Sequence, residues 1–289
     1  GYAYNTAGQV TEKNGLTGAS YTYNALGLIK TLTKNEGGTT TYTYDKAGRI
    51  TGFVDSEGTT TYTYDVNGNV ITASDDVGTV RREYDALNRV TKYTDINGRV
   101  IQYEYDSCGN LKKMTYPNGE NGTYTYDPNH NMLTSSMSNG AVSKASTFEY
   151  NSKNQITKIN NPDGSVVSKT YDSAGRLTRL KDVDKNGQII INDTYSYDNL
   201  GRITTETSAK NSIRYLMEYD NLGRLTKRTE YDISTSVIKK TELFTYDAAG
   251  NITKIVCGEK SITYQYDELN QMIRENNGVL GTTVLYTYD

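Results

Sequence analysis

The residues that could carry out chemistry are few, and they lie at turn positions. Two acidic pairs, Asp75 with Asp76 and Asp182 with Asp184, supply carboxylates of the kind used in acid–base catalysis or in binding calcium. Each pair lies where an aspartate serves the backbone of a turn, and neither has the regular ligand spacing of a calcium loop. The sequence therefore predicts a protein that is not an enzyme and has no metal site and no cofactor.

The remaining reactive side chains are isolated from one another. The only histidine, His130, ends the segment Asp127-Pro128-Asn129-His130, which superficially resembles an Asp-Pro cleavage element. A turn with proline in its favoured second place explains the segment more simply. A single histidine also supplies neither a catalytic triad nor a histidine metal cluster. We interpret Cys108 and Cys257 as two free thiols, with a disulfide between them as the alternative.

These residues belong to a repeat that fills the chain. The segment Thr41–Thr51, with the sequence Thr-Tyr-Thr-Tyr-Asp-Lys-Ala-Gly-Arg-Ile-Thr, recurs in close copies from one end to the other. The second tyrosine of each copy is its anchor, and fourteen anchors enclose thirteen repeats of 19 to 27 residues. The anchors are Tyr4, Tyr23, Tyr44, Tyr64, Tyr84, Tyr105, Tyr126, Tyr150, Tyr171, Tyr197, Tyr219, Tyr246, Tyr266 and Tyr288. A fixed period of this length predicts a stack of similar supersecondary units.

Each anchor begins a turn. The next residue is Asp in eleven copies and Asn in three, and both favour the first place of a type I turn. Four residues after the anchor comes Gly, or else Asn88, Asn154, Asn270 or His130, types that tolerate positive φ. The pattern predicts a three-residue hairpin loop, a type I turn followed by a left-handed residue in a G1 bulge.

This turn sets an expected register for the two strands. Tyrosines and the aliphatic residue six positions after the anchor then share one face, while Thr, Asp and Arg share the other. If that aliphatic residue is buried, replacing Ile203 with Ala should cost roughly 2 to 4 kcal/mol of stability. The register pairs Asp45 with Arg49, Tyr44 with Ile50, and Thr43 with Thr51, with Tyr42 on the Tyr44 face.

A second turn closes each repeat at the other end. Five segments have the same chemistry as the first turn: Asp55–Gly58, Asp75–Gly78, Asp95–Gly98, Asn161–Gly164 and Asp184–Gly187. The three longest repeats place their extra residues on this side, within 134–147, 181–193 and 229–240, so we expect one uniform rim and one with long hairpins. The predicted fold is all-β, a continuous antiparallel meander of about 13 β-hairpin repeats in a curved or spiralling single-layer sheet.

Composition agrees with a single layer and excludes several classes of protein. Hydrophobic residues make up only 35% of the chain, and tyrosine can cover a face while its hydroxyl stays in water. The net charge is −3 with scattered lysines and arginines, which argues against a nucleic-acid partner. We find neither a membrane span nor a signal peptide. Residues 1–289 are expected to form one segment with no second domain, cut within a repeat at both ends.

The motif Tyr-Asp-x-x-Gly-Arg-Leu/Ile-Thr, present at 171–178, 197–204 and 219–226, resembles the YD repeat of the Rhs family. Relatives with this repeat include Rhs polymorphic toxins, wall-associated YD proteins, the B and C components of insecticidal toxin complexes, and teneurins. The resemblance implies a sheet that spirals into a hollow shell, which in toxin members encloses a C-terminal toxic domain. This sequence has no aspartyl protease motif and no toxin domain after the repeats.

The resemblance also implies partners and a location. The partners would be the rest of the same polypeptide, including further repeats, a plug and a cargo domain, and the location secreted or at the cell surface. We expect a non-catalytic wall that encapsulates or displays another domain. The alternative is an adhesive module that binds glycans or wall polymer, although the chain lacks the Trp that such repeats use. The structural motif residues are Tyr44, Asp45, Gly48, Arg49, Ile50, Tyr171, Asp172, Gly175, Arg176, Leu177, Tyr197, Asp198, Gly201, Arg202, Ile203, Tyr219, Asp220, Gly223, Arg224 and Leu225.

Overall fold

The computed structural model describes residues 1–15, 18–35 and 37–288, and all regular elements in these ranges are β-strands. Contacts between Cα atoms divide the chain into two compact units. The first consists of Gly1–Thr125 with Ser135–Lys144, and the second of Tyr126–Thr134 with Ala145–Asp289. The expectation that residues 1–289 form one undivided segment stays a prediction.

In the first unit each strand pairs antiparallel with the next one in sequence. Its strands are β1 (Tyr2–Tyr4), β2 (Val10–Lys13), β3 (Ala19–Tyr23), β4 (Ile29–Lys34), β5 (Thr39–Tyr44), β6 (Ile50–Asp55), β7 (Gly58–Tyr64), β8 (Val70–Ser74), β9 (Thr79–Tyr84), β10 (Val90–Thr94), β11 (Val100–Tyr105), β12 (Leu111–Thr115) and β13 (Asn121–Tyr126).

The division between the units runs through β14 (Met132–Ser138) and β15 (Ser143–Tyr150). The strands that follow also pair antiparallel in sequence order from β15 onward. They are β16 (Ile156–Asn160), β17 (Val166–Tyr171), β18 (Leu177–Val183), β19 (Ile189–Tyr197), β20 (Ile203–Ser208), β21 (Ile213–Tyr219), β22 (Leu225–Asp232), β23 (Ile238–Tyr246), β24 (Ile252–Cys257), β25 (Lys260–Tyr266), β26 (Met272–Asn277) and β27 (Thr282–Leu285).

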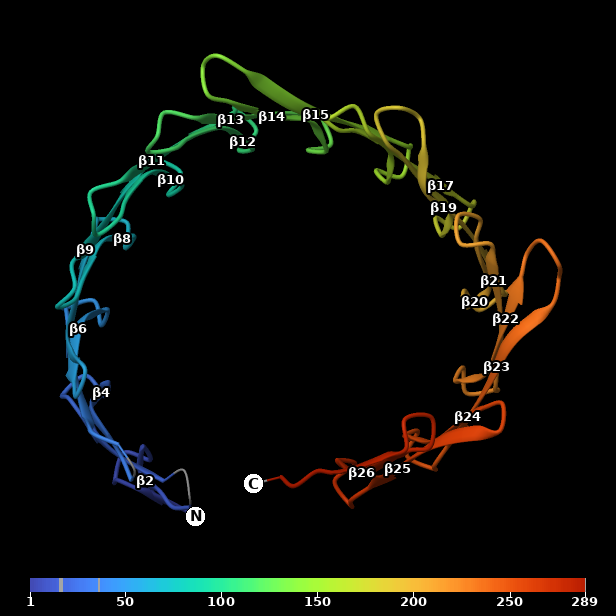
Figure 1. Cartoon of the computed structure of the whole chain (residues 1–289). Coiled ribbons are helices and arrows are strands. Elements are labelled where there is room, and N and C mark those ends of the chain that lie inside the picture. The colour runs from blue at the N-terminus through green and yellow to red at the C-terminus, as the bar shows by residue number, and fades with distance from the viewer. Residues whose placement is uncertain (16–17, 36, 289) are drawn as a thin grey trace. The chain divides into compact units, whose positions relative to one another are not determined.

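Each unit is a sheet one layer thick, with no second layer on either face (Figure 1). Ala19 is the only buried hydrophobic residue in the described part of the chain, and no large side chain there is fully buried. The accessible surface is 18473 Å², against about 12,000 Å² for a compact globule of this mass. The prediction of an all-β antiparallel meander in a single layer is therefore confirmed.

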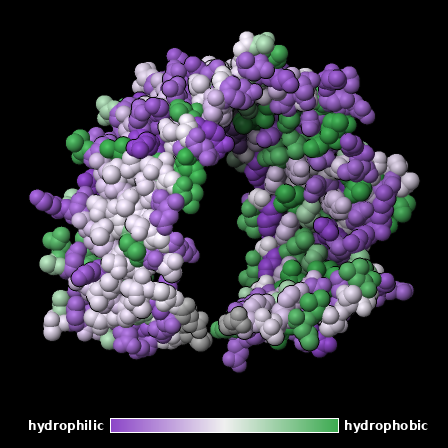
Figure 2. Space-filling model, turned by 60° about the vertical axis from the view of Figure 1, so that its left-hand side comes forward, coloured by the Kyte–Doolittle hydropathy of each residue, from purple (hydrophilic) through white to green (hydrophobic). Residues whose placement is uncertain are grey.

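The surface reflects the residue types of the strands. In Figure 2 the part that comes forward at the left, where Figure 1 shows β4, β6 and β8, is mostly white, the colour of near-neutral hydropathy. The strands between them are rich in threonine and tyrosine, as in the segments TTTYTY of β5 and GTTTYTY of β7. Such residues combine high β propensity with a polar atom that can remain in water, so both faces of a thin sheet can be exposed.

The turn after each anchor has the predicted geometry. The Asp45 amide donates to the Arg49 carbonyl at 3.0 Å, and the Gly48 amide donates to the Asp45 carbonyl at 3.1 Å. Gly48 has φ of 80°, so the loop is a type I turn with a G1 bulge. The residues predicted to replace glycine also have positive φ: Asn88 (61°), His130 (66°), Asn154 (59°) and Asn270 (60°). The turn prediction is confirmed.

The predicted register is wrong by one residue beyond the turn. Tyr44 pairs with Ile50 as expected, but Thr43 pairs with Gly52 and not with Thr51. Thr51 is the extra residue of a second bulge, and its hydroxyl donates to the Thr43 hydroxyl at 3.1 Å. The same shift recurs in the other described anchor hairpins, for example between Ser196 and Tyr197. A bulge increases the local twist, and the alternation of residue types alone does not reveal it.

The second turns are less uniform than predicted. Asp95, Asn161 and Asp184 begin three-residue loops like the first turn, each with its amide bonded to a carbonyl four residues on. Two others are tighter, because Asp55 pairs directly with Gly58 and the Asp75 amide donates to the Gly78 carbonyl at 3.0 Å. The long repeats lengthen their hairpins on this side, as predicted, and their extra residues mainly extend the strands, as in β22 and β23.

Candidate functional site

The distinctive chemistry of the chain lies at the junction between consecutive repeats, on the edge that carries the anchor turns. Between β20 and β21 the backbone ladder ends at Thr205 and Leu216, before the anchor turn is reached. Beyond that point the hydroxyl of Tyr219 donates to the carbonyl oxygen of Ile203 at 2.7 Å. The anchor tyrosine thus bonds to the backbone of the preceding hairpin where the backbone ladder has stopped.

This bond repeats along the chain. Twelve described anchors donate to the carbonyl of the aliphatic residue six positions after the preceding anchor, over 2.5 to 3.0 Å: Tyr23 to Val10, Tyr44 to Ile29, Tyr64 to Ile50, Tyr84 to Val70, Tyr105 to Val90, Tyr150 to Met132, Tyr171 to Ile156, Tyr197 to Leu177, Tyr219 to Ile203, Tyr246 to Leu225, Tyr266 to Ile252 and Tyr288 to Met272. The tyrosines and the aliphatic residues were predicted to share one face, but the hydrogen bond between them was not predicted.

Partial burial of the rings affects their titration. Burial is the largest cause that raises the pKa of Tyr44, Tyr171 and Tyr219 above the usual value of 10.0. A neutral phenol keeps its proton and can donate it, whereas a phenolate cannot. The raised pKa extends to higher pH the range in which these three tyrosines can donate.

Arginine adds a second connection at the junctions where it follows the turn. The Arg202 Nε donates to Asp198 Oδ2 at 2.6 Å within the turn, and Nη1 donates to the Asp220 carbonyl of the next turn at 3.2 Å. The guanidinium lies 4.7 Å from the ring centroid of Tyr219, at the distance of a cation–π contact. The alternation of residue types predicted such arginines on the face opposite the tyrosines, which is wrong for the guanidinium groups.

The same stacking occurs at each of the five arginines that lie five residues after an anchor. The pairs are Arg49 over Tyr64, Arg89 over Tyr105, Arg176 over Tyr197, Arg202 over Tyr219 and Arg224 over Tyr246, at 4.4 to 4.7 Å. One arginine therefore connects its own turn aspartate, the next anchor ring and, in four of the five cases, the next turn's backbone.

The turn aspartates are hydrogen-bonded as carboxylates. Asp45 Oδ1 accepts from the amides of Ala47 and Arg49 at 2.9 and 3.0 Å, and Oδ2 accepts from the Arg49 side chain at 2.7 Å. The backbone hydrogen bond from Arg49 is the largest cause that lowers the pKa of Asp45, and the Arg49 side chain lowers it further. The aspartate is therefore a structural acceptor, consistent with the role expected of it.

Asparagine makes a different connection at other junctions. Asn69 Nδ2 donates to Asp65 Oδ2 in its own turn and to Asn88 Oδ1 in the next turn, at 2.9 and 2.7 Å. The pair Asn251 and Asn270 is joined in the same way at 2.9 Å. In these pairs the second asparagine occupies the positive-φ position that is glycine in most repeats.

The two types of junction follow one rule in the sequence. The residue five positions after one anchor determines the residue four positions after the next. Where the first position is Asn, the second position in the next repeat is not Gly. This holds in all four cases: Asn69 and Asn88, Asn110 and His130, Asn131 and Asn154, Asn251 and Asn270. Where the first position is any other residue, the second position in the next repeat is Gly. This holds in all eight cases: Gln9 and Gly27, Leu28 and Gly48, Arg49 and Gly68, Arg89 and Gly109, Gln155 and Gly175, Arg176 and Gly201, Arg202 and Gly223, Arg224 and Gly250.

Contacts between the two positions account for part of the rule. A Cβ added at Gly68 would lie 3.4 Å from Arg49 Nη1, in ordinary contact, whereas one at Gly201 or Gly250 would meet no atom within 4 Å. Asn69 makes the opposite choice, because its amide bonds to the side chain of Asn88. Comparing each repeat with its successor would have revealed this coupling, whereas aligning equivalent positions within repeats did not.

The other candidates from the sequence do not assemble into a reactive site. Asp75 Oδ1 accepts from the amides of Val77 and Gly78, and so serves its turn. Within residues 1–15, 18–35 and 37–288 there is no group of three or more side chains that could hold a metal ion, and no helix suited to crossing a membrane. Cys108 is exposed, Cys257 is half-buried, and both are free. The motif residues are distributed over the junctions and do not line a common pocket.

Comparisons with known proteins identify relatives of this architecture. The family pattern described as RHS Repeat matches residues 23–58, 44–80, 84–121, 109–142 and 150–186, which together exceed half of the chain. No curated protein sequence matches. Two crystal structures of TcdB2-TccC3, one of them with Cdc42, are similar to 90% of this chain with a TM-score of 0.50 and 16% identity. The chain spans 17% of the length of those chains, and at this identity the likeness concerns the fold.

Proposed function

Because the chain belongs to the RHS repeat family, we propose that it is a segment of wall that encloses another domain of its own polypeptide. The observation that carries this proposal is the tyrosine hydroxyl that bonds each hairpin to the preceding one, as Tyr219 does to Ile203. Such a junction can be repeated without limit. A sheet with little hydrophobic core can therefore extend far enough to enclose another domain.

Several features support a wall with no catalytic role of its own. The turn aspartates are engaged by backbone amides and arginines, and the tyrosines donate to carbonyls, so the polar groups of the motif are used within the sheet. The TcdB2-TccC3 chains that share the fold are much longer than this one, which agrees with a repeat region attached to further parts. Membership in the family also supports a secreted or cell-surface location.

Protease protection in the natural polypeptide that carries these repeats tests the proposal. We expect the part outside the repeats to resist a protease in the wild type. It should become cleavable when Tyr171, Tyr197 and Tyr219 are all replaced by Phe, because three neighbouring junctions then lose a hydrogen bond. Tyr215→Phe is the control, since the Tyr215 hydroxyl has no hydrogen-bond partner in the described part of the chain. Equal cleavage of wild type and variant would favour display over enclosure.

A further inference from the structure

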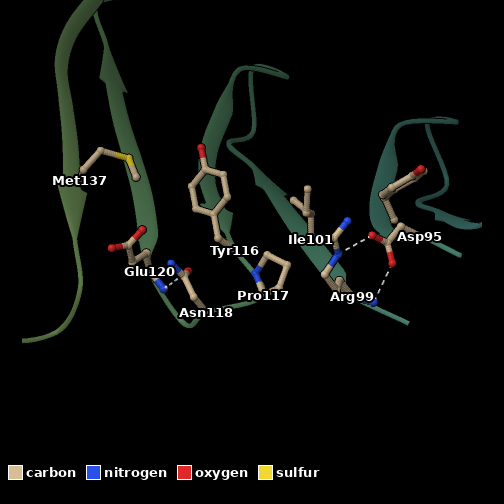
Figure 3. A pocket seen from close by; sticks show the side chains of 9 residues that line it. Asp95, Arg99, Ile101, Tyr116, Pro117, Asn118, Glu120 and Met137 are labelled. Atoms are coloured by element: carbon tan, nitrogen blue, oxygen red, sulfur yellow. Dashed lines mark hydrogen bonds and ion pairs between the residues drawn. The ribbon is translucent and has the colours of Figure 1, made fainter. Parts of the chain in front are cut away.

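One groove in the first unit departs from the repeat pattern (Figure 3). It has a volume of about 480 Å³, within the range of roughly 300 to 1,000 Å³ typical of small-molecule sites. It lies on the side of the second turns, and Met137 of β14, next to a long hairpin tip, forms one end. Ile101, Tyr116 and Pro117 line it together with polar side chains.

The unusual residue of this groove is Tyr116. It begins the turn Tyr116-Pro117-Asn118-Gly119, at a position that holds Asp or Asn in the five second turns identified from the sequence. An acid there supports the turn, as Asp95 does by accepting from the Asn97 and Arg99 amides at 2.9 Å. Tyrosine cannot do this, so an aromatic ring stands here at the expense of two local hydrogen bonds.

The register places a second tyrosine at a defined distance. Tyr93 pairs with Ile101, and the pairing of Gln102 with Thr115 puts Ile101 opposite Tyr116. Two aromatic residues therefore flank one isoleucine, with their strands about 9.6 Å apart, which is twice the interstrand distance. Because side chains stand roughly perpendicular to a sheet, the two tyrosines form the sides of a slot and Ile101 its floor.

The Tyr116 side chain is held in place by contacts with residues of β13. Its hydroxyl interacts with that of Tyr124, whose pKa is raised by burial first and by this neighbour second. Gly122 makes this contact possible, since a Cβ there would lie 2.8 Å from the Tyr124 hydroxyl and 3.3 Å from Met137 Sδ. A fixed aromatic side chain loses little conformational entropy when a ligand binds.

The rim of the slot offers both donors and acceptors. Arg99 donates through Nε to Asp95 Oδ2 at 2.6 Å, yet its side chain is 67% exposed, against 26 to 37% for the five arginines stacked at junctions. Its remaining N–H groups are thus accessible. Glu120 forms no ion pair among the described residues, and Asn118 Oδ1 accepts from the Glu120 amide at 3.1 Å, which leaves its Nδ2 free to donate.

We propose that this slot binds one ring of a carbohydrate. The C–H faces of a sugar ring suit the two tyrosines and Ile101, while its hydroxyl groups both donate and accept and so match Arg99, Asn118 and Glu120. An anion fits less well, because Asp95 already neutralises Arg99 and Glu120 adds a negative charge. Adhesion to a glycan would be additional to the wall function and does not depend on it.

A saccharide array tests the proposal with the 289-residue chain. The probes are immobilised mono- to tetrasaccharides of glucose, galactose, mannose and N-acetylglucosamine. We expect the wild type to be retained on at least one of these sugars, with binding weakened at least about tenfold by Tyr116→Asp. This variant installs the residue type that the neighbouring second turns use, so it should fold, and a circular dichroism melt checks that it does. Tyr93→Thr should weaken binding similarly.

Two controls make the result specific to the slot. Tyr215→Thr removes a tyrosine of the second unit and should leave retention within about twofold of wild type. Saturation-transfer NMR on the retained sugar should show transfer to its ring C–H protons, which is lost in Tyr116→Asp. Retention on no probe would overturn the proposal. So would sugar binding that survives both tyrosine substitutions, or binding lost only in Arg99→Gln, which would indicate recognition of charge.

Discussion

The hydroxyl of Tyr171 donates to the carbonyl oxygen of Ile156 at 2.9 Å, although the two residues belong to different hairpins. The backbone ladder between these hairpins ends at Lys158 and Ser168, so the side chain makes the last connection on that edge. A typical hydrogen bond contributes only about 0.5 to 1.5 kcal/mol. The stability of the sheet therefore depends on repeating this modest contact at each junction.

Removing one such hydroxyl should have a measurable cost. Tyr219→Phe keeps the ring beneath Arg202 and leaves the Ile203 carbonyl without its donor, so we expect a loss of about 0.5 to 1.5 kcal/mol in urea unfolding. Tyr215→Phe should change stability by less than about 0.5 kcal/mol. Equal effects of the two substitutions would show that the junction bond contributes nothing specific.

The coupling between repeats can be tested with a double-mutant cycle at Arg49 and Gly68. Gly68→Asn alone should destabilise by about 1 to 2 kcal/mol, because Gly68 has φ of 91° and Arg49 Nη1 lies 3.4 Å from the position of the new Cβ. Adding Arg49→Asn reproduces the natural pair of Asn69 and Asn88, so the double variant should be more stable than the sum of the single effects by at least about 0.5 kcal/mol. Simple additivity in urea melts would contradict the rule.

Stability should fall in acid. The pKa is lowered from 3.8 in twelve described aspartates: Asp45, Asp65, Asp85, Asp95, Asp106, Asp127, Asp163, Asp172, Asp198, Asp220, Asp232 and Asp247. A carboxylate with a lowered folded-state pKa stabilises the fold above its unfolded pKa, and this contribution is lost as pH falls through the folded value. The urea midpoint should therefore be constant near neutrality and decline below about pH 4.

Asparagine provides the control for this pH dependence, since Asn5, Asn24 and Asn151 occupy the same turn position in three repeats. A variant with Asn in place of Asp172, Asp198 and Asp220 should be less stable at pH 7 and less sensitive to acid. An unchanged slope of the urea midpoint against pH in this variant would mean that other groups cause the acid transition.

The aliphatic ladder should tolerate truncation better than a core would. Ile203 is only half-buried, so Ile203→Ala should cost about 1 to 2 kcal/mol, below the 2 to 4 kcal/mol expected for a buried residue. The measurement is the unfolding free energy in urea, with Ile190→Ala, an exposed position of β19, as the control. A cost near 4 kcal/mol would imply that a further layer covers this face.

The sequence was sufficient to predict the anchor turns, which depend on local backbone chemistry. The spacing of Asp85 and Asn88 predicted a positive φ at Asn88 because few residue types accept that conformation. The position of Thr51 could not be predicted, since a bulge changes the pairing without changing the alternation of residue types. The contact of Tyr64 with Ile50 lies between hairpins, and no spacing within one repeat encodes it.

The direction of the junction bonds has a consequence for synthesis. Each anchor tyrosine donates backward to a residue made earlier, as Tyr246 does to Leu225, and each stacked arginine is made before the ring that it covers. A hairpin leaving the ribosome thus meets a partner that already presents its carbonyl and its guanidinium. The sheet can therefore grow one hairpin at a time, so that at its growing end only the newest hairpin has an unpaired edge.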